Sequence, residues 1–194
     1  MTLRRLRHET APLHERVERT LDLPARLTSL SAYTALLTRF HGFYAPLEDR
    51  LAGVGGSEAA GLDFAARRKA HLLRDDLLAL GHSPEAVGAL PSCPSLPAVG
   101  SLAEAFGCLY VLEGSTLGGQ FIRREAAARL GLGPGTGCSF FTGYGDRTGA
   151  MWKAFGTALT AYTDAHPEAQ DAVVNAAAET FTRLDDWVRG GDAQ

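Results

Sequence analysis

The sequence is poor in the features that mark several common classes of protein. Its three cysteines, Cys93, Cys108 and Cys138, are far apart and form no C-x-x-C pair, so neither a disulfide framework nor a zinc site is expected. No window reaches the roughly 20 apolar residues of a membrane-spanning helix, and the first residues, MTLRRLRHETAPLHERVE, lack the apolar stretch of a secretory signal. We therefore expect a cytoplasmic protein without a membrane partner.

A strong charge of either sign is also missing. The formal net charge is −3, from 19 Lys and Arg against 22 Asp and Glu. Proteins that bind nucleic acid usually carry a clear basic excess, so no nucleic-acid partner is expected. The chain has 194 residues and is 45% hydrophobic, which is enough to bury a core without disulfides. We expect one domain over residues 1–194.

No segment alternates convincingly between apolar and polar residues, whereas helical spacing recurs along the whole chain. Leu3, Leu6, Leu13 and Val17 predict a first helix, in a region that Pro24 ends. The sequence therefore predicts a compact all-α domain of about six to eight helices. A second helix is expected from Ser29–Ser31 to Leu51, with a bend at Pro46, and a third from the cap Asp63 to Gly81. The proline-rich connection 81–100 should contain at most a short helical turn. Later helices are expected from the capping box Ser101 and Glu104 to Gly131 or Gly133, from the cap Thr148 over 149–165, and over 168–189.

The stretch YVLEGSTLGGQFIRREAAARLGL, residues 110–132, is unusual for a helix because it contains several glycines. Each interior glycine costs roughly 0.5–1 kcal/mol relative to alanine. Gly114 and Gly118 are four residues apart, as are Ser115 and Gly119, so the two pairs form neighbouring rows on one helical face. Such a smooth strip fits either close packing of another helix or a flat, bulky ligand lying against the backbone.

Among the six histidines, His14 is distinctive because it borders the apolar stripe of the first helix. Arg7 lies two turns before it on the same face, and Glu18 lies one turn after it. A histidine that binds a metal commonly has a carboxylate on its other ring nitrogen, and Glu18 is placed to serve. The alternative is a histidine buried in the core with its hydrogen bonds satisfied.

Two segments together, RLRHETAPLHERVE and YVLEGSTLGGQFI, resemble the heme oxygenase family, particularly its bacterial branch. The resemblance continues through SAYTALLTRFHGFYAPLEDRL and FFTGYGDRTGAMWKAF into the last helix, so it covers nearly the whole chain. It implies a compact helical bundle with a heme slot between the first helix and a kinked, glycine-rich distal helix.

The resemblance also implies a role for several residues that would bind heme. His14 falls at the position of the proximal heme ligand, and Glu18 at the position that supports the proximal imidazole. Arg7 falls where related enzymes place a basic residue near the heme propionates, and Lys153 matches a second propionate partner.

On the distal side, the resemblance places Gly114, Gly118 and Gly119 in the helix that kinks over the iron. Side chains at Gly114 or Gly118 would strike the porphyrin or the bound O₂. Animal members carry an acidic residue just after the first glycine, whereas this chain has Ser115. We therefore expect Ser115, Thr116, free backbone carbonyls and water to take over the delivery of protons.

The implied activity is the cleavage of heme to biliverdin, Fe²⁺ and CO, with O₂ and an external electron donor. Heme is both cofactor and substrate. Basic residues of the first and distal helices, Arg4, Arg5, Arg7, Arg123 and Arg124, predict an acidic electron carrier such as a ferredoxin or flavodoxin with its reductase. Iron acquisition and supply of bilin to a phytochrome are both purposes that bacterial members serve.

Three other functions compete with this interpretation. A di-iron oxidase of the same fold typically needs E-x-x-H, which the chain does not contain. A heme carrier or sensor that binds heme without degrading it would use the same His14 and glycines. A helical interaction module would use the glycine strip only for packing and would take up no heme.

Overall fold

The computed structural model describes residues 2–56, 58 and 60–190, and this part of the chain contains helices and connections without a strand. Six helices have ten residues or more, and three others have four or five, so the predicted all-α fold is confirmed. The helices are α1 (Thr2–Leu21), α2 (Leu23–Arg26), α3 (Leu30–Ala52), α4 (Ala70–Ala79), α5 (Pro84–Gly88), α6 (Leu102–Leu130), α7 (Ser139–Thr142), α8 (Thr148–Ala165) and α9 (Gln170–Arg189), with 3₁₀ turns η1 (Ala65–Arg67), η2 (Gly145–Arg147) and η3 (Pro167–Ala169).

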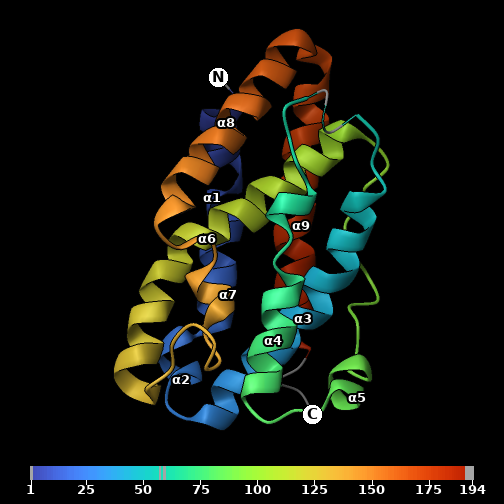
Figure 1. The fold of residues 1–194 in the computed structure, drawn as a ribbon. Coiled ribbons are helices and arrows are strands. Elements are labelled where there is room, and N and C mark those ends of the chain that lie inside the picture. Colours follow the sequence, from blue (N-terminus) through green and yellow to red (C-terminus); the bar gives the residue numbers. More distant parts are fainter. Residues whose placement is uncertain (1, 57, 59, 191–194) are drawn as a thin grey trace.

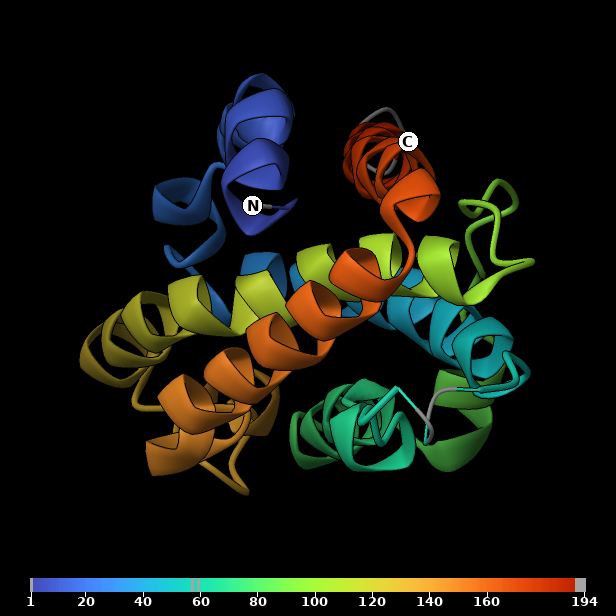
Figure 2. The same ribbon diagram turned by 90° about the horizontal axis from the view of Figure 1, so that it is seen from above.

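Helix α6 is the centre of the fold. Figure 2 shows α1 and α9 on one side of α6 and α4 on the other side, while α8 crosses α6. The first half of α6 is buried almost all round, as expected for a helix that has neighbours on every face. Helix α6 packs against α9, and α9 packs against α1, so α1 is held next to α6 largely through α9.

A glycine that the sequence analysis did not single out makes the α6–α9 contact close. A Cβ atom on Gly107 would lie 2.3 Å from the Val173 carbonyl oxygen and 2.7 Å from the Ala176 Cβ. Both distances are far below van der Waals contact, so only glycine fits at this crossing. Gly107 therefore sets how closely α9 approaches the central helix.

The predicted starts of α3 and α6 are confirmed by their capping contacts. Ser29 accepts the backbone N–H of Ala32, and Ser101 accepts that of Glu104. Helix α6 ends at Gly131, which has a φ of 68° and thus the left-handed conformation that glycine tolerates. Pro46 lies inside α3, as predicted.

The prediction of one helix from Asp63 to Gly81 is wrong. Asp63 caps only the turn η1, by accepting the N–H of Ala66, and Arg68 is extended. Helix α4 starts afresh at Ala70 because the Glu48 carboxylate, from α3, accepts the N–H groups of Lys69 (2.7 Å) and Ala70 (3.1 Å). A cap supplied by a distant helix leaves no local sequence signal.

Two predicted boundary residues also have other roles. Pro24 does not end a region but lies in the first turn of α2, because Asp22 has already ended α1 with a φ of 39°. The Thr148 hydroxyl donates to the Gly145 carbonyl oxygen instead of accepting an N–H, so Thr148 is the first residue of α8 and not its cap.

Candidate functional site

A cavity of about 600 Å³ opens between α1 and α6, and α8 and α9 complete its walls. This volume is typical of sites that bind small molecules. The structure brings five of the predicted site residues to this one cavity: Arg7, His14, Glu18, Gly114 and Ser115. The remaining lining is largely apolar or aromatic and comprises Thr10, Ala11, Glu15, Tyr110, Val111, Leu117, Trp152, Phe181 and Leu184.

His14 is the principal polar group on the α1 wall. Its side chain is 57% exposed, so it is not a histidine buried in the core. The Nδ1 atom lies 3.5 Å from the Glu18 carboxylate, and the ring meets Phe181 edge-on with centroids 5.7 Å apart. Within the described part of the chain, no side chain or backbone group pairs with Nε2. Glu18 thus lies beside one ring nitrogen of His14, and the other nitrogen is available to a ligand.

Arg7 supplies a positive charge at the same wall. It forms no ion pair with any residue of the described ranges, whereas its neighbour Arg5 is paired with Glu9 and Asp171. An exposed guanidinium without a carboxylate partner is suited to form bidentate hydrogen bonds with an anionic group of a ligand.

The glycines of α6 divide into two groups. A Cβ on Gly114 would lie in ordinary contact with the Trp152 ring of α8, at 3.8 Å, and one on Gly118 would have nothing within 4 Å, so neither position needs glycine to avoid a clash. Gly119 differs, since its Cβ would lie 3.2 Å from the Phe141 carbonyl oxygen. Packing therefore explains Gly119 but neither Gly114 nor Gly118. Of these three glycines, Gly114 lines the cavity, whereas Gly118 and Gly119 do not.

The hydroxyls that follow Gly114 bond to the helix backbone. Ser115 Oγ donates to the Leu112 carbonyl (2.8 Å), and Thr116 Oγ1 donates to that of Glu113. Such bonds compete with the helical ladder and bend helices. Figures 1 and 2 both show α6 changing direction part way along its length, which agrees with the predicted kink. Thr116 is buried and lies outside the cavity lining.

Ser115 is also connected to the core. Because its hydroxyl hydrogen is used for Leu112, its oxygen accepts from the Tyr44 hydroxyl at 2.9 Å. Burial raises the pKa of Tyr44, so this phenol stays protonated and remains a donor. The sequence analysis missed Tyr44, whose position in the apolar stripe of α3 looks like that of any core aromatic residue.

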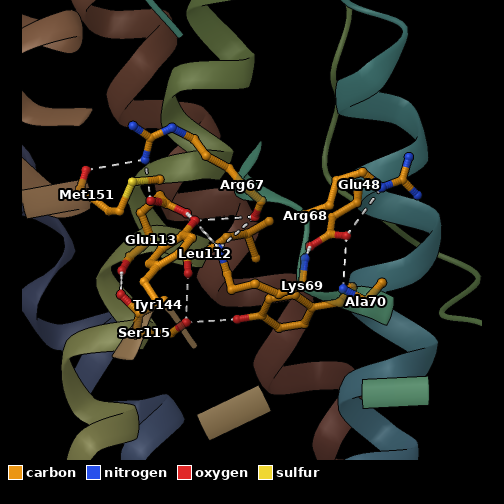
Figure 3. A network of polar contacts seen from close by, with 12 residues as sticks. Glu48, Arg67, Arg68, Lys69, Ala70, Leu112, Glu113, Ser115, Tyr144 and Met151 are labelled. Carbon is orange, nitrogen blue, oxygen red and sulfur yellow. Dashed lines mark hydrogen bonds and ion pairs between the residues drawn. The ribbon is translucent and has the colours of Figure 1, made fainter. Parts of the chain in front are cut away.

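Next to the glycines lies a buried polar group that we call the Glu113 cluster: Arg67, Lys69, Glu113 and Tyr144 (Figure 3). The Glu113 carboxylate is 1% exposed and accepts from Arg67, from Lys69 Nζ at 2.6 Å and from the Tyr144 hydroxyl at 2.7 Å. The sequence analysis missed this cluster, because Arg67 and Lys69 were assigned to a continuous helix.

Lys153 does not line the cavity. It is exposed and borders a separate hollow over α8 with Leu3 and Gly156, so the structure gives it no contact with the predicted site. Of the other basic residues near the site, Arg4 and Arg124 are exposed and Arg123 is half-buried.

In residues 2–56, 58 and 60–190, no group of three or more His, Cys, Asp or Glu is placed to hold a metal ion. Among the helices that the structure describes, none has both the length and the apolar character of a membrane span.

Comparison with known proteins gives consistent results. Residues 2–190 match the family model described as heme oxygenase. A protein named heme oxygenase from Xanthomonas campestris pv. campestris (strain 8004) is 32% identical over 151 residues, covering 75% of this chain and 82% of that protein. The crystal structure of the NO- and CO-bound heme oxygenase from Neisseria meningitidis is similar in fold, with a TM-score of 0.81, 21% identity, and coverage of 98% of this chain and 92% of that one.

Proposed function

The chain belongs to the heme oxygenase family, and we propose that the cavity between α1 and α6 is where it binds and degrades heme. The protein is an oxidoreductase that degrades heme. The assignment of this activity to the cavity is carried by one observation: His14 on α1 and the Gly114–Ser115 backbone on α6 line the same space of about 600 Å³.

The residues of the cavity fit heme in chemistry and in shape. His14 offers a free imidazole nitrogen as axial ligand, and Glu18 orients the ring from the other nitrogen. Trp152, Phe181 and Leu184 provide apolar surface for a porphyrin, and the missing side chain at Gly114 leaves room above it. Arg7 is the cation we assign to the propionates.

Bound heme supplies both the iron that activates O₂ and the ring that is oxidised. His14 would hold the iron through one imidazole, and the iron would supply the O₂ chemistry on the α6 side of the cavity. There the Ser115 hydroxyl, fixed by Leu112 and Tyr44, can hold a water molecule but not act as a strong acid. We assign to Ser115 the orientation of water, and to water the delivery of protons.

The finer features of the reaction belong to this proposal. The products are biliverdin, Fe²⁺ and CO, the oxidant is O₂, and electrons come from an acidic carrier such as a ferredoxin or flavodoxin. Arg4 and Arg124, which are exposed, are the remaining candidates for a basic docking surface, since Arg5 is already paired with carboxylates.

Turnover with defined reductants tests the proposal. The protein is mixed with heme and either ascorbate or a ferredoxin with its reductase, and the bilin is identified by chromatography. We expect the main heme absorption band to disappear while a bilin spectrum grows. Heme uptake without bilin would instead mean a carrier or sensor, and no uptake would mean a helical interaction module.

A further inference from the structure

The Glu113 cluster joins four segments of the chain. Glu113 comes from α6, Arg67 and Lys69 come from the end of η1 and the start of α4, and Tyr144 comes from the connection before η2. Arg67 Nη1 also donates to the Met151 carbonyl oxygen of α8 at 3.3 Å. Arg67 is 6% exposed and Glu113 is 1% exposed. Figure 3 shows Arg67 between the carboxylate of Glu113 and the backbone of Met151.

The two residues that Arg67 holds each precede a residue of the cavity wall. Glu113 precedes Gly114, and Met151 precedes Trp152. Gly114 and Trp152 both line the cavity, and a Cβ on Gly114 would lie 3.8 and 3.9 Å from two atoms of the Trp152 ring. Arg67 thus connects α6 and α8 through the residues directly before Gly114 and Trp152, which lie next to each other at the cavity.

The position of Arg67 and Lys69 depends on the broken helix described above. The extended residue Arg68 separates them, and the Glu48 carboxylate caps α4 behind Lys69. A continuous helix would turn residues 67 and 69 to different faces, since successive helical residues are about 100° apart. The break therefore lets both cations reach one carboxylate.

We infer that Glu113 and Arg67 are positioning residues, which fix the Gly114–Trp152 wall of the cavity; this inference rests on the proposed function. Stability alone is a poor reason for such a cluster, because buried ion pairs are often replaceable by apolar residues without loss. They do impose a specific geometry, since each donor must meet the carboxylate at hydrogen-bond distance. Burial and the nearby Glu113 carboxylate raise the pKa of Tyr144, which keeps this phenol a donor.

The first test needs no heme. The chain has two tryptophans, so 5-fluorotryptophan labelling gives two ¹⁹F resonances, which Trp187→Phe assigns. Glu113→Gln should shift the Trp152 resonance and leave that of Trp187, whose Nε1 donates to the Arg39 carbonyl, in place. Asp76→Asn is the control: it also alters a fully buried carboxylate, but Asp76 accepts the N–H groups of Ser139 and Phe140 at the start of α7 and bonds to no residue of the Glu113 cluster. It should leave the Trp152 resonance unchanged.

The second test uses heme. A wall displaced by about 1 Å costs roughly 100-fold in rate, so Glu113→Gln should lose bilin formation on that scale, whereas Asp76→Asn should keep it. If Glu113→Gln does not fold, Tyr144→Phe removes one donor to the carboxylate and should shift the Trp152 resonance in part. An unchanged Trp152 resonance in the folded variants overturns the inference. A natural chain that takes up no heme would overturn the proposed function instead, and the ¹⁹F result would still decide the role of Glu113.

Discussion

Gly118 should be a residue whose replacement makes the heme-free protein more stable. It lies inside α6, where alanine is favoured over glycine by about 0.8–1.0 kcal/mol. A Cβ atom at this position would have nothing within 4 Å, so no steric penalty offsets the gain. A change of 1 kcal/mol moves the melting temperature of a 150–250-residue domain by roughly 2–4 °C. Gly118→Ala should therefore raise Tm by about that amount.

The control is the glycine that packing requires. Gly107→Ala would place a Cβ 2.3 Å from the backbone carbonyl of Val173, which cannot turn aside as a flexible side chain can. Overpacking of a core typically costs about 1–3 kcal/mol, so Tm should fall instead of rise. Thermal unfolding of the heme-free proteins, followed by circular dichroism, measures both shifts on the same scale.

The stabilised variant should be the poorer enzyme. Gly118 does not itself line the cavity, but it lies one turn beyond Gly114 on the same side of α6. We therefore expect a large side chain at Gly118 to reach toward the space that we assign to heme and O₂. Gly118→Leu should fold and form little bilin, and Gly118→Ala should be intermediate. A lower Tm for Gly118→Ala would refute the claim that a Cβ atom at this position meets no other atom of the protein. A higher Tm with bilin formed at the unmodified rate would refute the assignment of Gly118 to the heme pocket.

Three other variants test the remaining site residues. His14→Ala should still bind heme but lose the absorption spectrum of imidazole-ligated iron and nearly all turnover. Added imidazole should partly restore turnover. Unchanged heme absorption bands would exclude His14 as the ligand. Ser115→Ala should slow turnover modestly while costing about 1–3 kcal/mol of stability, because it leaves the buried Tyr44 hydroxyl unpaired; complete loss of turnover would show that the hydroxyl itself is indispensable. Arg124→Glu should raise the KM for a ferredoxin without changing heme affinity. Turnover driven by ferredoxin should fall with ionic strength more than turnover driven by ascorbate, because salt screens charges beyond a Debye length of about 8 Å at 0.15 M. Equal salt dependence with both reductants would show that the arginines dock no carrier.

The parts of the fold that the sequence predicted are those with local causes. Ser29 and Ser101 cap their helices with their own side chains, and Gly131 ends α6 with its own backbone conformation. That His14, Arg7 and Glu18 share one helical face could also be predicted, because helical geometry alone places residues at this spacing on one face. The structure then places all three at the cavity.

The parts that could not be predicted depend on contacts between distant segments. Glu48 starts α4 from another helix, 22 residues before Ala70 in the sequence. In the same way, Lys69 meets Glu113 across 44 residues. In the sequence, Glu113 in one segment and Arg67 and Lys69 in another look like ordinary surface charges, because only the fold brings them together.

The glycines show why one sequence pattern can carry several physical meanings. Gly107, Gly114, Gly118 and Gly119 are all helical residues of α6 that lack a side chain. A Cβ would collide with α9 at Gly107 and crowd α7 at Gly119, so packing accounts for these two. At Gly114 and Gly118 it would meet ordinary contact or open space, so the folded chain itself gives no reason for glycine there. A residue that costs stability and relieves no contact within the protein is best explained by a ligand. Of the four glycines, Gly114 is the one that lines the cavity together with His14, so the proposed heme site depends on the central helix at this residue.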